Sequence, residues 1–234
     1  MTAHAGEDFV ANLGSRLNLL RAGVLGANDG IVSVAGLVVG VAGATTDRTA
    51  IAVAGIAGLV AGAFSMAGGE YVSVSTQRDT ERATLDKERW ELDTMPEVEL
   101  TELAGIYERK GISPDVAHEV ARQLTAHDAL GAHAEAELGI DPESLTSPWQ
   151  AALASFVAFV LGASLPLVAI LLPVSGWRVT SCVAAVVLAL TLTGWISARL
   201  GGANVGRAVL RNVGLGLVSM LVTYWVGRLV GTQI

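Results

Sequence analysis

The sequence predicts an all-α integral membrane protein with five transmembrane helices and a three-helix polar domain inserted between spans two and three. Hydrophobic residues make up 52% of the 234 residues, and the mean hydropathy is +0.53. They are gathered into long runs, as is typical of chains that cross a bilayer. A span needs roughly 20 apolar residues to cross a hydrocarbon core of about 30 Å. Five runs qualify: residues 21–44, 49–73, 150–173, 179–199 and 209–230.

Three segments organise the chain. Residues 1–75 hold an N-terminal interfacial helix, expected over 9–20 with Arg16 on its wet side, followed by spans one and two. An unstructured leader is an equally open interpretation of 9–20. Residues 76–146 form the polar domain, and residues 147–234 hold spans three to five. No glycine or proline lies between Glu70 and Trp90, so span two is expected to continue directly into the first polar helix.

The polar segment is strongly acidic. It holds 17 of the 22 acidic residues but only 7 of the 15 lysines and arginines, together with His118, His127 and His133. Oxygen and nitrogen ligands at this density favour cations over nucleic acid as partners. Pro96 separates the first polar helix from a second, which Gly111 can end, and a third runs to about Gly139.

Positive charges predict the orientation. Arginines flank the N-terminal side of span one, the end of span two and the link between spans four and five, whereas only Arg48 and Arg178 lie in the opposite loops. By the positive-inside rule, the N-terminus and the acidic domain are expected in the cytoplasm.

Span one carries an anomaly in "GANDG", where Asn28 and Asp29 interrupt an apolar run. A carboxylate within a span costs roughly 2.5–3.5 kcal/mol by insertion scales, so it is expected to face a bundle interior or a water path. Gly26 and Gly30 could loosen the helix there and let backbone carbonyls join the carboxylate in facing a cation. The alternative is that Asp29 caps the helix near the interface.

Span two carries a second anomaly. Met66 and Glu70 are four residues apart and therefore share a helical face. A thioether beside a carboxylate is a softer ligand set than oxygen alone and favours ferrous iron or similar metals over magnesium or calcium. Met66 alone is more often core filler. Glu70 could share a metal or proton with Asp29, or lie solvated at the interface.

The polar domain shows paired carboxylates at helical spacing. The pairs are Glu88 with Glu91, and Glu99 with Glu102, which could clamp cations or could be solvated helix faces. On the third helix His133 and Glu137 share a face, whereas Glu135 points elsewhere. The candidate metal ligands are therefore Glu88, Glu91, Glu99, Glu102, His133, Glu135 and Glu137.

Three motifs in order resemble the vacuolar iron transporter family, in its bacterial branch. They are "GVLGANDGIVS", "GAFSMAGGEYVSVSTQRDTE" and "QLTAHDALGAHAEAELGI", and the resemblance covers nearly the whole chain from about Leu19. It implies a homodimer of five-span subunits that exchanges cytosolic ferrous iron, and often manganese, for protons, and that carries a cytoplasmic three-helix metal-binding domain.

By motif, the resemblance places Asp29 and Met66 on the translocation path at the dimer interface. It places the four paired glutamates and Glu137 in the metal-binding domain. The chain departs from the better-studied eukaryotic pattern at His133 and Ala134, where those members have a methionine and a glutamate. This departure puts the metal stoichiometry and the preference for ferrous iron in question.

The predicted function is export of Fe²⁺, and also Mn²⁺, from the cytosol in exchange for protons. Asn28, Asp29, Met66 and Glu70 would line the path. No cofactor is expected to be bound permanently: Fe²⁺, or Mn²⁺, Co²⁺ or Zn²⁺, would be cargo and domain-bound ions. The chain is not expected to be an enzyme, and the bacterial cytoplasmic membrane is its expected location. The alternatives are a membrane-anchored metal sensor or buffer, and a di-iron carboxylate oxidase, although the chain lacks the paired Glu-x-x-His motifs of that chemistry.

Overall fold

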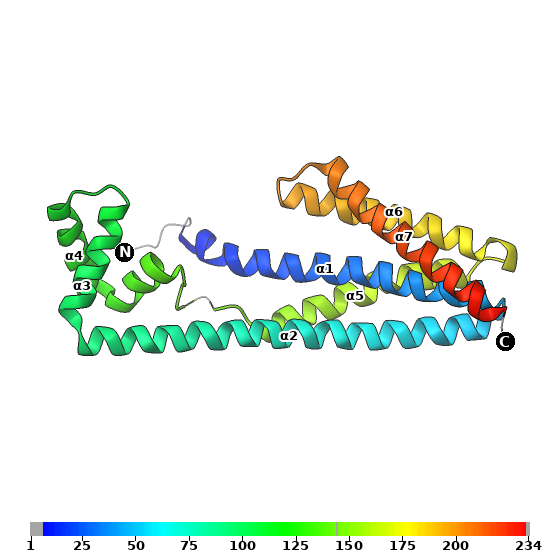
Figure 1. Cartoon of the computed structure of the whole chain (residues 1–234), viewed down its shortest axis with the longest axis horizontal. Coiled ribbons are helices and arrows are strands. Elements are labelled where there is room, and N and C mark those ends of the chain that lie inside the picture. Colours follow the sequence, from blue (N-terminus) through cyan, green and yellow to red (C-terminus); the bar gives the residue numbers. More distant parts are fainter. Residues whose placement is uncertain (1–6, 144, 233–234) are drawn as a thin grey trace. The chain divides into compact units, whose positions relative to one another are not determined.

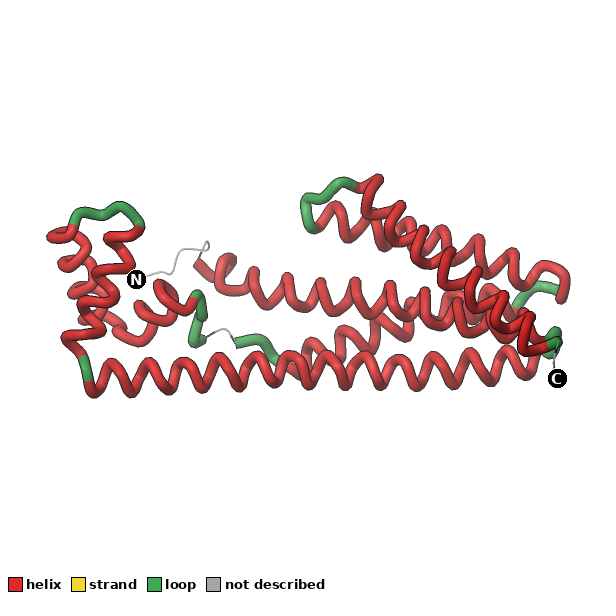
Figure 2. Tube along the Cα trace, in the orientation of Figure 1, coloured by secondary structure: helices red, strands yellow, loops and turns green. Residues whose placement is uncertain are grey.

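The chain is helical through almost all of its described length. The computed structural model describes residues 7–143 and 145–232, and the side chains of 20–143, 145–174 and 176–232. None of the described residues lies in a strand (Figure 2), so the all-α prediction is confirmed. The elements are α1 (Glu7–Ala44), α2 (Arg48–Thr94), α3 (Pro96–Arg109), α4 (Pro114–His133), the π-helical turn η1 (Ala134–Leu138), α5 (Pro148–Leu171), the 3₁₀ turn η2 (Ser175–Trp177), α6 (Arg178–Leu200) and α7 (Val205–Gly231) (Figure 1).

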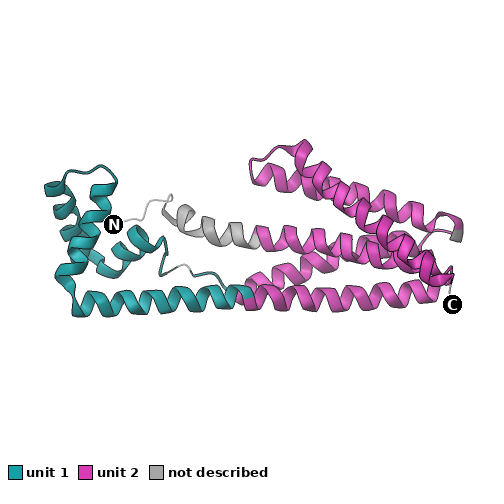
Figure 3. Ribbon diagram, in the orientation of Figure 1, with its two compact units in different colours: residues 1–16, 73–147 teal, residues 17–72, 148–234 magenta. Residues whose placement is uncertain are grey.

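The chain divides into two compact units (Figure 3). The apolar unit comprises residues 17–72 and 148–234, and the polar unit comprises residues 1–16 and 73–147. Helix α2 contributes to both, because it runs without a break from Arg48 to Thr94. Span two therefore continues into the first polar helix, as the absence of glycine and proline after Glu70 predicted.

Five helices of the apolar unit are long and apolar enough to span a membrane, as the hydropathy runs predicted. They are Leu20–Ala44 within α1, and α2, α5, α6 and α7. The apolar window of α1 is 44% buried within the chain, whereas that of α7 is only 11% buried. Helix α1 is therefore the central helix of the unit, and the others present leucine and valine side chains outward, as expected of helices in lipid.

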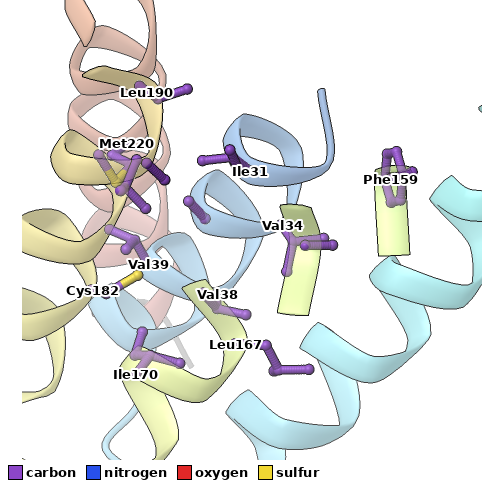
Figure 4. Close-up of a cluster of buried hydrophobic side chains, with 14 of the residues drawn as sticks. Ile31, Val34, Val38, Val39, Phe159, Leu167, Ile170, Cys182, Leu190 and Met220 are labelled. Atoms are coloured by element: carbon purple, nitrogen blue, oxygen red, sulfur yellow. The ribbon is translucent and has the colours of Figure 1, made fainter. Parts of the chain in front are cut away.

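The core of the apolar unit surrounds α1 (Figure 4). Ile31 and Val39 of α1 pack in the same cluster as Leu190 of α6 and Met220 of α7. Burying each such side chain contributes about 1.5–3 kcal/mol in water, but between helices in lipid the gain comes from close van der Waals packing. Close packing requires helix axes that approach each other, which small residues permit.

Glycines bring α1 close to α5, and this overturns one prediction. A Cβ at Gly26 would lie 2.7 Å from the backbone oxygen of Ser155, and one at Gly30 would meet the backbone oxygen of Phe159. Helix α1 is continuous through "GANDG", so these glycines do not loosen it. They allow α5 to lie against α1, which is a packing role. The spacing of glycines in the sequence fits both this role and a break in the helix.

The N-terminal part of α1 also differs from the prediction. The helix expected over 9–20 is not separate, because α1 begins at Glu7 and continues through the first span. Arg16 was predicted on the wet side of this helix, but its side chain is not among those that the structure describes. At the other end of α1, Arg178 Nη1 donates to the carbonyl oxygen of Thr46 at 3.0 Å. The loop between α1 and α2 and the start of α6 therefore lie at the same end of the apolar unit (Figure 1).

Gly30→Ala is expected to destabilise the apolar unit, because its methyl group would force α1 and α5 apart. Overpacking of this kind costs about 1–3 kcal/mol. Gly214→Ala in α7 is the matched control, since nothing lies within 4 Å of a Cβ there and alanine is the better helix former. The midpoint of thermal unfolding in detergent should fall for Gly30→Ala and hold or rise for Gly214→Ala. Equal midpoints would contradict the close-packing role of Gly30.

Candidate metal site and candidate transport cavity

Three potential metal ligands from three helices meet inside the polar unit. They are Glu88 on α2, Glu99 on α3 and His133 at the end of α4, and one ligand atom from each lies within 4.8 Å of the others. The two glutamates are each 4% exposed and the histidine is fully buried. Charged side chains are almost never buried to this extent unless they are paired or bind a cation.

Carboxylates surround one nitrogen of the buried imidazole. His133 Nδ1 lies 2.9 Å from Glu88 Oε1, 3.8 Å from Glu99 Oε2 and 3.7 Å from Glu137 Oε2. Glu137 is partly exposed, so its carboxylate lies between the cluster and solvent. Three acidic oxygens and one nitrogen converge, and this donor set suits a divalent transition metal.

Buried polar atoms without hydrogen-bond partners make this site suitable for a cation. Among the described side chains, both His133 ring nitrogens and Glu88 Oε1 are buried without a hydrogen-bond partner. The short Nδ1–Oε1 separation therefore does not have the geometry of a hydrogen bond. Leaving such groups unpaired costs roughly 1–3 kcal/mol each, and a cation bound to His133 Nδ1 and Glu88 Oε1 would remove that cost at these two atoms.

Local sequence features bring His133 and Glu137 to the cluster. Asp128 has non-helical backbone angles (φ −157°, ψ 94°) inside α4, and its Oδ1 accepts a hydrogen bond of 3.0 Å from the Gly131 N–H. This capping contact begins a new helical turn that leads to His133. The π-helical turn η1 follows, ends at Leu138 and is capped by Gly139, whose φ of 64° is accessible to glycine without strain. Such π-turns are frequent at functional sites.

Burial also changes the acidity of the site. The pKa of Glu88 is raised, first by burial and then by the nearby Glu137 carboxylate. The pKa of Glu99 is raised, first by burial and then by Glu102. His133 opposes both shifts. The two carboxyls therefore hold protons more tightly than free glutamate does, and protons and metal compete for the same oxygens.

The metal-free polar unit is expected to lose stability as the pH rises. Because both folded-state pKa values lie above the ordinary value of 4.5, the stabilisation from the protonated carboxyls is complete below that value and is lost as the pH rises through the raised pKa. Glu88→Gln removes this dependence at one position. In chelator, its unfolding midpoint should exceed that of the parent most at pH 7, and the gap should close towards pH 4.5. A gap that does not vary with pH would contradict the raised pKa.

The remaining predicted ligands lie at the edge of the cluster or outside it. Glu91 is bound by Lys87, whose Nζ lies 2.6 Å from its carboxylate, and this hydrogen bond is the main cause of the raised Lys87 pKa. Glu102 is exposed and lines a shallow groove on α3 with Arg109. Glu135 is exposed. The structure thus buries one glutamate of each predicted pair.

The apolar unit contains a cavity of about 350 Å³ between α1, α2 and α5. Asp29, Met66 and Glu70, predicted from separate anomalies in the two spans, all line it. Its other lining residues are small or apolar: Ser33, Val34, Leu37, Gly58, Gly62, Ser65, Gly69 and Phe159. Two carboxylates and a thioether therefore share one hollow within the apolar unit.

Each cavity carboxylate has a partner that the sequence interpretation missed. Asp29 Oδ1 accepts a hydrogen bond of 2.7 Å from Ser33 Oγ. Glu70 Oε1 lies 3.6 Å from an amino group of Arg21. Ser33 could have been found from its spacing of four residues from Asp29. The fourth predicted path residue, Asn28, is not among the lining residues, and its Oδ1 is buried without a hydrogen-bond partner.

These features define a class: multi-span helical membrane proteins with ionisable side chains in an intramembrane cavity, an arrangement typical of ion transporters. The chain belongs to the VIT family, whose members it matches over residues 20–228. It is 43% identical to a vacuolar iron transporter of Acanthamoeba castellanii over 96% of this chain and 83% of the relative. It is also 39% identical to vacuolar iron transporter homolog 1 of Oryza sativa subsp. japonica, over 97% of this chain and 80% of the relative.

A further relative is vacuolar iron transporter homolog 1 of Arabidopsis thaliana, 37% identical over 93% of this chain and 86% of the relative. The predicted resemblance to vacuolar iron transporters is therefore confirmed. The family consists of transporters rather than enzymes, which agrees with the prediction that the chain has no enzymatic activity.

Proposed function

We propose that this chain transports ferrous iron, and also manganese, out of the cytosol in exchange for protons. The names of its relatives support iron as cargo. The observation that carries the proposal for this chain is the cavity in which Asp29, Met66 and Glu70 meet. Carboxylates give charge to hold a divalent ion, and the thioether favours a softer metal over calcium or magnesium.

Proton exchange follows from the same chemistry. A carboxylate oxygen can hold a proton or a metal ion but not both, so binding one releases the other. Asp29 suits this role because, in the described part of the chain, Ser33 Oγ donates to one of its oxygens and further lone pairs stay available for cargo. Protons that enter from the side of lower pH would then discharge the metal.

The polar unit would collect metal before transport. Its buried Glu88, Glu99 and His133 can hold one ion, and Glu137 can reach the same centre. By the positive-inside rule this unit is cytoplasmic, so it would bind cytosolic metal. We also propose that two copies of the chain assemble in the membrane, with the cavity of each close to the seam between them.

Flux into proteoliposomes tests the proposal. The reconstituted protein should carry Fe²⁺ under anaerobic conditions when a proton gradient is imposed, and the gradient should collapse as metal moves. Liposomes without protein and liposomes without the gradient are the controls. Flux that ignores the gradient would reject exchange. Binding without flux would instead favour a membrane-anchored sensor or buffer, and oxygen-dependent oxidation of Fe²⁺ would favour the oxidase.

A further inference from the structure

Arg21 supplies a permanent positive charge at the transport cavity. One of its amino groups lies 3.6 Å from Oε1 of Glu70, which lines the cavity. A guanidinium stays protonated at every physiological pH. Within the described structure, one of the two cavity carboxylates is thus already paired with a cation that belongs to the chain.

The two partners differ in their freedom to move. The Arg21 side chain is 64% exposed, whereas that of Glu70 is only 10% exposed. The arginine can swing away and keep its charge hydrated, since long charged side chains readily extend to water. Glu70 would then remain beside the cavity with its charge uncompensated. The arginine is therefore the displaceable partner of the pair.

The helical register places this pair at one end of a series of donors. Helices α1 and α2 are joined by residues 45–47 and run antiparallel, so Arg21 and Glu70 lie at nearly the same level from that loop. At 1.5 Å per residue, Met66 lies about 6 Å closer to the loop than Glu70, and Asp29 about 4–5 Å closer still. A cation entering at Glu70 would meet the three donors in that order.

We propose that Arg21 is a tethered counter-ion that occupies Glu70 when the cavity holds no metal and that an entering divalent cation displaces. The inference depends on the proposed transport function and adds to it a positioning residue that sets the apparent affinity for cargo. A divalent ion competes well with the guanidinium because its charge is double and it can bind Glu70 closely. The pair has a long separation of 3.6 Å and one partner, Arg21, that is largely exposed, so such competition can break it.

Removing the counter-ion should therefore tighten binding of cargo. Arg21→Ala should lower the half-saturating Fe²⁺ concentration of flux by up to about fivefold, the upper factor for a long ion pair with one exposed partner. Arg21→Lys keeps the charge and should stay close to the parent. In the Glu70→Gln background, Arg21→Ala should change the half-saturating concentration little, because no carboxylate remains to be released.

The experiment measures initial flux against Fe²⁺ concentration for the parent, these variants and Arg211→Ala, a matched loss of an exposed arginine on α7. Half-saturation and maximal rate are read separately. The proposal is overturned if Arg21→Ala leaves half-saturation unchanged, raises it, or lowers it equally in the Glu70→Gln background. It is also overturned if Arg211→Ala reproduces the effect. Failure of the parent to transport would instead reject the function on which the proposal depends.

Discussion

Asp29→Asn is expected to reduce metal flux by roughly 100-fold or more. The asparagine keeps the size of the side chain and can still accept the hydrogen bond from Ser33 Oγ, so the cavity should keep its shape. It removes the negative charge, and with it both the attraction for a divalent ion and the group that is proposed to exchange a proton. Loss of even an outer partner of a metal ligand costs about 10- to 100-fold, and Asp29 is proposed to touch the ion directly.

Proteoliposome flux of Fe²⁺ measures this effect, and two variants serve as controls. Asp47→Asn removes a carboxylate from the loop between α1 and α2, where Asp47 accepts from the Thr49 N–H outside the cavity. Its flux should stay close to that of the parent. Ser33→Ala removes only the hydrogen bond to Asp29 and should reduce flux modestly. Asp29→Asn flux equal to that of Asp47→Asn would show that metal does not pass this carboxylate.

The spans were predictable because bilayer thickness imposes a length on them. A run of about 20 apolar residues is distinctive in any sequence, and all five runs fall in helices of that kind. The role of Gly26 and Gly30 was not predictable in the same way. Glycine weakens a helix and also permits close contact between helices, and only the position of α5 decides between these effects. The structure shows the second.

The metal site was predicted as a set of residues but not as an arrangement. Residues three apart on a helix differ by about 60° in direction, so a pair such as Glu88 and Glu91 need not face the same centre. Packing of α2, α3 and α4 buries Glu88 and Glu99 and leaves Glu102 exposed. Which member of each pair faces inward depends on contacts between helices, and no spacing rule within one helix contains that information.

Two features of the structure could not be predicted from residue spacing or composition. The change of direction at Asp128 interrupts a segment whose composition favours a continuous helix, and it depends on the side chain bonding to Gly131. In the sequence analysis, Arg21 contributed only to the predicted membrane orientation, as one of the arginines before span one. Its contact with Glu70 became visible once α1 and α2 lay side by side. Pairings between residues of different helices are the part that a single sequence conveys least.

Both sites combine carboxylates with one softer ligand, which has a consequence for their selectivity. The cavity offers the thioether of Met66, and the polar unit offers the imidazole of His133. Nitrogen and sulfur ligands both favour iron and its later neighbours over calcium and magnesium. If the two sites act in series, each of them discriminates against the abundant alkaline-earth ions.

His133→Ala is expected to weaken metal binding by the polar unit at least about tenfold, because it removes the only nitrogen of the donor set. Even outer-shell partners of a metal are worth 10- to 100-fold, and the imidazole lies among three carboxylates, with Glu88 at 2.9 Å. Calorimetric titration of the full chain with Fe²⁺, without oxygen, measures the affinity. An Asp29→Asn/Glu70→Gln background confines the signal to the polar unit, since it removes both cavity carboxylates.

His127→Ala is the matched control, since His127 lies on the same helix but is exposed and outside the cluster. It should bind metal as the parent does. A second variant, His133→Gln, keeps polar atoms near the carboxylates and separates loss of the ligand from loss of packing: its affinity should fall while its unfolding midpoint stays near that of the parent. Unchanged affinity in both His133 variants would exclude the imidazole as a ligand. The glutamates alone would then hold the ion. A site made only of carboxylates would be less selective for Fe²⁺ over Mn²⁺ and Mg²⁺ than a site that includes the imidazole.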